Sequence, residues 1–326
     1  MIRYIAARLG WAAPTVLLIV ILNFIIIHVV PGDPVSALVG DFPSPPGYVE
    51  SVRASFGLDK PILTQLWLYL VNMAQGNLGF SFANRQPVLD LVLSRAQLTL
   101  LLMIPSLLLS AVLGIMVGMA AAPRAGKGVD SFITTLSLLG YSIPIFWLGQ
   151  LLITVFAIQF NWLPAQGMIS LRVKPTGMAA AIDVFWHMVL PVACITTYYA
   201  AIVARVARAS VIEALHHDYI LTARAKGLSA RETLWKHALP NAIVPVITVI
   251  GYNFGYSLTG AILVESVFAW PGVGALFLSS VGNRDYPVLQ GIFLLAGFAV
   301  VCANLVTDIA CALVDPRVRK SQSGGQ

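Results

Sequence analysis

The stretch Asp218-Tyr-Ile-Leu-Thr-Ala-Arg-Ala-Lys-Gly-Leu-Ser229 lies between two apolar runs that are each long enough to cross a bilayer. Its residues predict two short helices. Asp218 is suited to cap the first helix, and Gly227 stands where a helix ends in a left-handed residue. Ser229 and Glu232 have the spacing of a capping box that opens the second helix, and Pro240 marks the start of the next apolar run. Basic charge beside a membrane would not by itself require this order of helix signals, so we interpret residues 213–240 as a surface that binds another molecule.

Composition places the chain among proteins with several membrane spans. Of its 326 residues, 58% are hydrophobic and only 10% are charged, which excludes an ordinary soluble domain. Charge-free runs predict an all-α membrane helical bundle of six transmembrane helices in a single domain, residues 1–326. The spans are expected at about 9–30, 97–121, 131–159, 186–205, 241–264 and 287–311, with an outer segment at 31–95 and a loop at 206–240. The third span is interpreted as one unbroken helix.

The distribution of Lys and Arg sets the expected orientation. If the N-terminus is cytoplasmic, thirteen of the 20 basic residues lie in inner segments and the rest lie in the longer outer segments, where charge has less influence on topology. Both termini are therefore predicted to be cytoplasmic, and this bias accounts for the net charge of +6. A nucleic-acid-binding protein needs a basic face with residues that read bases. We find no such pattern, so we expect a lipid bilayer and no nucleic acid as partner.

Several pieces of the sequence carry a resemblance to a known family. They are Pro31-Gly-Asp-Pro34, the stretch from Asp218 to Leu228 with its Leu239-Pro240 ending, the loop Glu265–Gly274, and Asp315-Pro-Arg317. These motifs resemble those of permease subunits of ATP-binding cassette (ABC) importers, in the branch that carries dipeptides and oligopeptides. The resemblance implies the Type I ABC importer permease fold in the bacterial plasma membrane. It also implies that the chain forms half of the path for di- or oligopeptides.

The same resemblance implies partners and a docking site. A second homologous permease subunit would complete the path, two cytosolic ATPase subunits (or one fused) would dock on the 213–240 loop, and an extracytoplasmic peptide-binding protein would deliver substrate. The implied ATPase-docking residues are Asp218, Tyr219, Thr222, Ala223, Arg224, Ala225, Lys226 and Gly227. The wider superfamily begins this motif with Glu-Ala-Ala, whereas this chain has Leu221-Thr222-Ala223. A salt bridge from the leading glutamate cannot be carried over, so Asp218, Arg224 and Lys226 become the candidate polar contacts.

The sequence contains no Gly-x-x-x-x-Gly-Lys-Ser/Thr phosphate loop. We therefore predict that the chain is not an enzyme, and we expect ATP and Mg²⁺ in the partner ATPases. No cofactor and no metal site is predicted, because His216 and His217 are adjacent on a helix and point about 100 degrees apart. A self-contained secondary transporter or channel is the alternative from a different class. Such proteins place ionisable groups at mid-membrane, whereas His28, His187 and Asp308 lie near the ends of the predicted spans.

Polar residues inside the predicted spans are candidates for the translocation path: Tyr141, Ser142, Thr197, Asn253 and Ser257. Hydrogen bonding between helices of the bundle is an equally good interpretation of each one. Two Gly-x-x-x-Gly motifs, one beginning at Gly114 and the other at Gly251, predict close helix contacts. These contacts could form within the chain or with a second permease subunit, and the sequence does not choose.

The loop Glu265–Gly274 follows the fifth predicted span on the outer side. Its turn residues suggest that Glu265, Phe268 and Trp270 are exposed at the outer mouth and contact the binding protein. The alternative is that the two aromatic side chains anchor the end of span five at the membrane interface. The exact substrate stays open, because importers of nickel, glutathione and glycosides resemble the same branch. The sequence also leaves open whether the ATPases are fused and whether the two permease subunits are identical.

Overall fold

The computed structural model describes residues 2–29, 39, 43–170, 175–260 and 262–314, and this part of the chain is mostly helical. The helices and strands are α1 (Ile2–Val29), α3 (Tyr48–Phe56), α4 (Ile62–Ala74), β1 (Phe80–Ser81), β2 (Gln86–Pro87), α5 (Val88–Ala121), α6 (Gly128–Ser142), α7 (Ile145–Leu152), α8 (Met178–Leu215), α9 (Asp218–Ala225), α10 (Ala230–Thr233), α11 (Leu239–Gly260), α12 (Ile262–Val267), α13 (Val273–Gly282) and α14 (Tyr286–Val314). A 3-10 turn (Ala122–Arg124) follows α5, and π-helical turns follow α7 (Ile153–Gln159) and precede α11 (Leu234–Ala238).

Four helical stretches of the described chain are long and apolar enough to cross a membrane: Val88–Arg124, Met178–Leu215, Ala230–Gly255 and Tyr286–Val314. The pair α6 and α7 provides a fifth if it is counted as one bent span. α1 contributes a further, shorter apolar stretch, Gly10–Ile26. A helical protein with four to five candidate spans is therefore established, and the count of six stays a prediction.

The third predicted span is not the unbroken helix that we expected. α6 ends at Ser142, α7 begins at Ile145, and the two helices are bent by 96° at the break. The cause is local, because a proline disfavours the helical conformation in the residue before it. Ile143, which precedes Pro144, is accordingly extended, with ψ of 124°. The interpretation of 131–159 as a single helix is therefore wrong.

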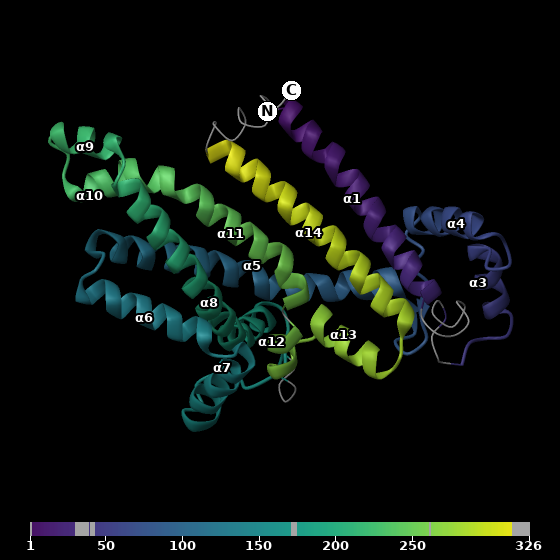
Figure 1. Cartoon of the computed structure of the whole chain (residues 1–326). Helices are drawn as coiled ribbons and strands as arrows, with labels where there is room; N and C mark the ends of the chain where they lie inside the picture. The colour runs from purple at the N-terminus through teal and green to yellow at the C-terminus, as the bar shows by residue number, and fades with distance from the viewer. Residues whose placement is uncertain (1, 30–38, 40–42, 171–174, 261, 315–326) are drawn as a thin grey trace.

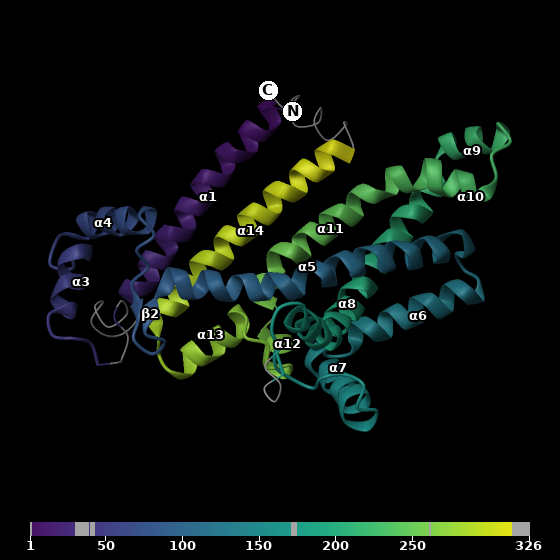
Figure 2. The same ribbon diagram turned by 180° about the vertical axis from the view of Figure 1, so that it is seen from behind.

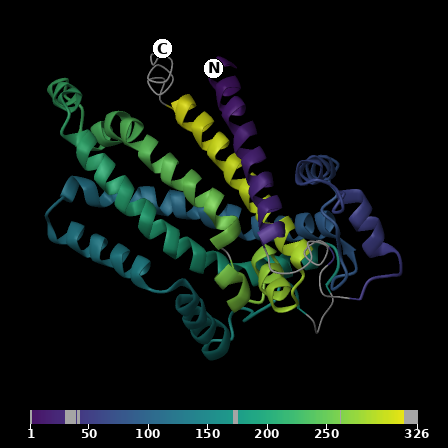
Figure 3. The same cartoon turned by 45° about the vertical axis from the view of Figure 1, so that its right-hand side comes forward.

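Long helices packed side by side form the body of the molecule (Figures 1 and 3). α5 packs along α8, and α8 also contacts α6 and α11. α14 contacts both α11 and α1, which places the first and last helices of the described residues next to each other (Figure 2). α9 and α10 project from one end of the bundle, and α3 and α4 lie at the opposite end (Figure 1). We call these the α9 end and the α3 end.

Both Gly-x-x-x-Gly motifs are used inside the chain. An added Cβ at Gly114 would lie 2.6 Å from Val203 Cβ, and one at Gly118 would lie 2.7 Å from Ala207 Cβ, so α5 approaches α8 closely at this motif. The second motif does the same between α11 and α14, where an added Cβ at Gly251 would collide with Thr307. These two surfaces are therefore occupied by neighbouring helices of the same subunit, which answers a question that the sequence left open.

The α3 end is held together by its own small core and by polar contacts. Phe24 of α1 and Tyr69 of α4 are buried together with Val52 of α3. β1 pairs antiparallel with β2, and the buried Ser81 hydroxyl donates to the carboxylate of Asp285 over 2.5 Å. The hairpin is therefore fixed against the start of α14, which lies about 200 residues further along the chain.

Candidate functional site

The loop between α8 and α11 forms two short helices, as the sequence predicts, but its first cap differs. α8 ends at Leu215 and α9 begins at Asp218. The N-cap residue of α9 is His217, and no side chain caps this helix. The expectation that Asp218 caps α9 is wrong, because Asp218 already lies in the first turn. A carboxylate there still interacts favourably with the helix dipole.

The end of α9 and the start of α10 confirm the other two local predictions. Gly227 has φ of 83°, and its N–H donates to the carbonyl of Arg224 over 2.9 Å. Side chains with a Cβ rarely adopt this conformation, so glycine is favoured at the turn. Ser229 and Glu232 form the complete capping box: the N–H of Glu232 donates to Ser229 Oγ, and the N–H of Ser229 donates to Glu232 Oε2, both over 3.2 Å.

α9 has one buried stripe and an exposed remainder. Ile220 and Ala223, three residues apart and therefore on one face, are 1% and 4% exposed. Ile220 packs into a cluster with Met119 of α5, Val211 of α8 and Ala238 before α11. The small size of Ala223 thus serves packing inside this chain. The other residues predicted for docking are exposed: Asp218, Tyr219, Thr222, Arg224, Ala225, Lys226 and Gly227.

The exposed side of the loop combines apolar and cationic side chains. Leu221 is 63% exposed and Trp235 is 50% exposed. Arg224, Lys226 and Arg231 are exposed on the same two-helix unit. Large apolar side chains in water are a cost unless a partner covers them, and aromatic residues together with arginine are enriched where proteins bind proteins. Within the described residues no group of three His, Cys, Asp or Glu side chains could hold a metal ion.

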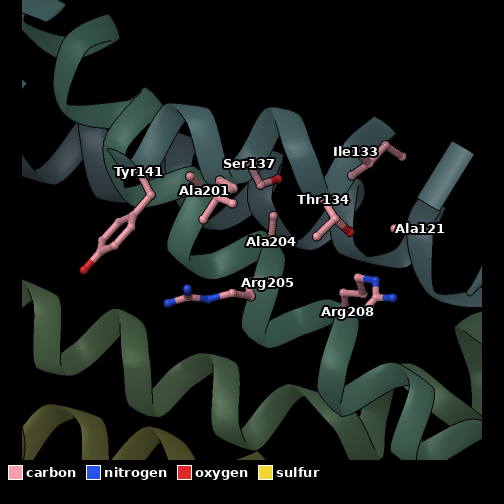
Figure 4. A pocket seen from close by; sticks show the side chains of 10 residues that line it. Ala121, Ile133, Thr134, Ser137, Tyr141, Ala201, Ala204, Arg205 and Arg208 are labelled. Atoms are coloured by element: carbon pink, nitrogen blue, oxygen red, sulfur yellow. The ribbon is translucent and has the colours of Figure 1, made fainter. Parts of the chain in front are cut away.

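A second polar feature lies between α6 and α8 (Figure 4). Arg208 of α8 donates to both carboxylate oxygens of Asp130 in α6, over 2.5 and 2.7 Å. The guanidinium of Arg205, one turn earlier, lies 5.4 Å from the ring centre of Tyr141. Tyr141, Arg205 and Arg208 line a hollow of about 90 Å³ between the two helices. Sequence analysis missed both arginines, although an aspartate at the start of one apolar helix and arginines within the next were a visible signal of pairing.

The structure brings together only part of the predicted translocation path. Tyr141 is 42% exposed and stacks on Tyr198, with ring centres 5.5 Å apart. Thr197 is exposed on α8, and Ser142 lies exposed at the break after α6. Asn253 is buried in α11 and 9% exposed. Ser257 lies in the same helix, but its side chain is outside the described residues.

The predicted outer contact site is not a surface. Glu265 and Trp270 are fully buried and Phe268 is 2% exposed. The Trp270 indole N–H donates to the carbonyl of Leu98 over 2.9 Å, and Phe268 packs into the core with Leu190 and Ile195 of α8. The expectation that these three residues are exposed is therefore wrong, and so is the alternative of aromatic side chains anchored at an interface. Turn residues at Pro271 and Gly272 fold the loop back onto α5 instead of presenting it.

The buried carboxylate of Glu265 organises this loop. Glu265 Oε1 accepts a hydrogen bond from the Thr99 hydroxyl over 2.6 Å, and Oε2 accepts the N–H groups of Gly274 and Ala275 over 2.7 and 3.1 Å. Gly274 and Ala275 lie in the first turn of α13, where N–H groups have no partner within the helix. Thr99 also accepts the N–H of Val273 over 2.9 Å. Glu265 therefore joins α12, α5 and α13.

Comparisons with known proteins give the same type of transport protein for both the N-terminal and the C-terminal part of the chain. The family described as binding-protein-dependent transport system inner membrane component matches residues 114–320, and the corresponding N-terminal family matches residues 1–103. The di/tripeptide transport system permease protein DppB of Pseudomonas aeruginosa (strain UCBPP-PA14) is 38% identical over 333 residues, covering 98% of this chain and 99% of that protein. The glutathione transport system permease protein GsiC of Escherichia coli O6:H1 (strain CFT073) is 39% identical over 319 residues, with the same two coverages.

A solved structure gives the fold independently. The MetNI methionine ABC transporter, in inward-facing conformations, superposes with a TM-score of 0.54 at 18% identity, over 69% of this chain and 96% of that chain. At this identity the likeness concerns the fold alone. The family match over more than half of the chain and the two full-length relatives show more. The chain belongs to the family of binding-protein-dependent transport system inner membrane components, as a permease subunit of an ABC importer of the peptide type.

Proposed function

We propose that this chain is one of two related permease subunits of a bacterial importer for peptides of two or three residues. The observation that carries this substrate class is the likeness, over nearly the full length of both chains, to a permease named for di- and tripeptides. The second relative is named for glutathione, which is itself a tripeptide. The two names therefore share small peptides as substrate.

The α9–α10 loop is proposed to dock a cytosolic ATPase. Its exposed side carries Leu221 and Trp235 among cations, and its buried side packs through Ile220 against α5, α8 and the start of α11. Movement of α9 would thus be transmitted to the ends of three long helices. We propose that ATP and Mg²⁺ bind in the ATPase, that closure of two ATPase domains rocks the bundle, and that an extracytoplasmic binding protein delivers peptide at the α3 end.

Reconstitution tests this function. Proteoliposomes that contain this chain, the partner permease and the ATPases should accumulate radiolabelled trialanine only when ATP is on the ATPase side and the binding protein is on the other. This chain reconstituted alone should accumulate none. Uptake by the chain alone, driven by an ion gradient, would contradict the proposal and favour a secondary transporter. ATP-dependent uptake of nickel or of a glycoside, with no uptake of trialanine, would contradict only the proposed substrate class.

Cysteine labelling tests the proposed orientation. Ser229 at the α9 end and Asn283 after α13 are both exposed, and the three native cysteines can be replaced by alanine. We expect Asn283→Cys to react with an impermeant thiol reagent in intact cells, and Ser229→Cys to react only after permeabilisation. The reason is that basic segments stay on the cytosolic side. Reaction of Ser229→Cys in intact cells would mean that the orientation is inverted and that a cytosolic ATPase cannot reach α9.

A further inference from the structure

The hollow between α6 and α8 contains a positive charge that no acidic side chain balances. Among the described residues, the guanidinium of Arg205 has no ion-pair or hydrogen-bond partner. It makes a cation–π contact with the ring of Tyr141. Arg208 differs, because both oxygens of Asp130 hold it. Asp130 is 4% exposed and turned towards Arg208, so it does not neutralise Arg205. Arg205 is exposed and is the last residue of the span predicted at 186–205, so its guanidinium is accessible to a ligand.

The surroundings of Arg205 suit an oxyanion. Figure 4 shows its guanidinium extending from α8 towards Tyr141 of α6, with the hydroxyl-bearing residues Ser137 and Thr134 along the same side of the hollow. A guanidinium offers paired N–H donors that match the two oxygens of a carboxylate. The stacked rings of Tyr141 and Tyr198 hold one wall in place. A hollow of about 90 Å³ admits a carboxylate group but not a whole peptide.

The position of Arg205 along α8 connects it with the predicted path. Thr197, Ala201 and Arg205 are spaced by four residues and therefore share one face of the helix. Gly140 of α6 faces this stripe: a Cβ added there would lie 3.6 Å from Ala201 Cβ and 3.9 Å from Thr197 Cγ2. The same face thus carries Thr197 and the charge, and it lies against the helix that carries Tyr141. A substrate that moves along this face towards the α9 end meets Arg205 before Arg208.

We propose that Arg205, with Tyr141 beside it, binds the carboxylate of the peptide during translocation. This inference rests on the proposed function, because it assumes a peptide as substrate. The shared chemistry is that of an oxyanion, and a phospholipid phosphate could also supply it. We commit to the substrate carboxylate because Arg205 and the ring of Tyr141 line the same hollow, on the helix face that carries Thr197. Lipid and partner-subunit oxyanions are the alternatives that the experiment separates.

The test uses the complete complex and three substitutions, Arg205→Gln, Arg205→Lys and Arg205→Glu. Arg124→Gln is the matched control, because Arg124 is exposed but lies outside the hollow and outside α9. ATP-dependent trialanine uptake, basal ATP hydrolysis and complex yield are measured in vesicles of phosphatidylcholine alone and of phosphatidylcholine with added phosphatidylglycerol. We expect Arg205→Gln to reduce the maximal uptake rate about tenfold in both vesicle types, the factor that one charge-assisted contact of ordinary strength supplies. Arg205→Lys should retain more uptake, and Arg205→Glu should retain less.

Basal ATP hydrolysis and complex yield should stay at the wild-type level in all variants. Unchanged uptake by Arg205→Gln would overturn the inference. Loss of uptake confined to vesicles with phosphatidylglycerol would assign Arg205 to a lipid phosphate. Loss of complex yield or of basal hydrolysis would assign it to an ion pair with another subunit. If the wild-type complex takes up no peptide, the proposed function fails. If the wild-type complex is active and Arg205→Gln is equally active, only the inference about Arg205 fails.

Discussion

Replacing Glu265 by alanine should destabilise the whole complex by roughly 2 to 6 kcal/mol, because the N–H groups of Gly274 and Ala275 lose the carboxylate that accepts them, and each such loss costs about 1 to 3 kcal/mol. The carboxylate is fully buried and accepts from Thr99, Gly274 and Ala275. In the variant the first turn of α13 would have no acceptor for these groups. The loop would also lose its connection to α5. The measurement is the thermal unfolding midpoint of the purified complex in detergent.

Two further substitutions make this prediction specific. Glu265→Gln keeps one oxygen that can accept the N–H groups of Gly274 and Ala275, so we expect it to retain most of the stability. Asp59→Ala removes an exposed carboxylate in the turn before α4 and should leave the midpoint unchanged, because surface substitutions usually change stability by less than about 0.5 kcal/mol. Equal midpoints for Glu265→Ala and Asp59→Ala would show that the buried carboxylate does not organise the loop.

The same network explains why the outer loop was misread from sequence. Aromatic residues beside Pro271 and Gly272 indicate an exposed turn when only the neighbouring residues in the sequence are considered. Their burial depends on Thr99 and Leu98, which lie more than 160 residues away in sequence. A hydrogen bond of that range leaves no local signal. The unusual feature in the sequence was Glu265 itself, a lone charge in an apolar segment, which needs a buried partner or an exposed position.

Local signals were reliable where the deciding interaction is itself local. The capping box joins Ser229 to a residue three positions away, and the left-handed turn at Gly227 depends on the backbone of one residue. Both were predicted. The break before Pro144 was also a local signal, but the apolar run continues through it, and span length was given more weight. Asp218 failed as a cap because the N-cap position is His217, one residue earlier, and spacing alone does not fix a helix start to one residue.

Contacts between helices follow a different rule. The small residues Gly114 and Gly251 predict close helix packing but do not identify the partner helix. The structure shows that the partners are α8 and α14 of the same chain. The pair between Asp130 and Arg208 joins residues 78 positions apart, so it becomes visible only when α6 lies beside α8. Sequence therefore predicted the two short helices of the α9–α10 loop and their place between two long helices. It could not predict which of the loop's residues face outward.

The division of α9 into buried and exposed residues sharpens the docking proposal. Ile220 and Leu221 are adjacent and apolar, yet Ile220 is 1% exposed and Leu221 is 63% exposed. If α9 docks an ATPase, a substitution at Leu221 should weaken only the binding of the ATPase. A substitution at Ile220 should also disturb the folding of the loop. The pair therefore provides matched variants that differ in position by one residue.

Leu221→Asp should reduce co-purification of the ATPase at least about tenfold, because a buried charge at the centre of an interface typically costs more than 1.4 kcal/mol, which is a factor of ten in binding. The yield and the unfolding midpoint of the permease itself should stay at the wild-type level, since the side chain lies on the surface. Ile220→Asp should lower both, because its carboxylate would be placed in the cluster with Met119 and Val211. Pull-down of tagged permease, with ATPase quantified per permease, measures the first effect. If Leu221→Asp binds as much ATPase as wild type and supports the same ATP-dependent uptake, the exposed side of α9 is not the docking surface, and the small and cationic residues of this loop serve only its own fold and its retention at the membrane.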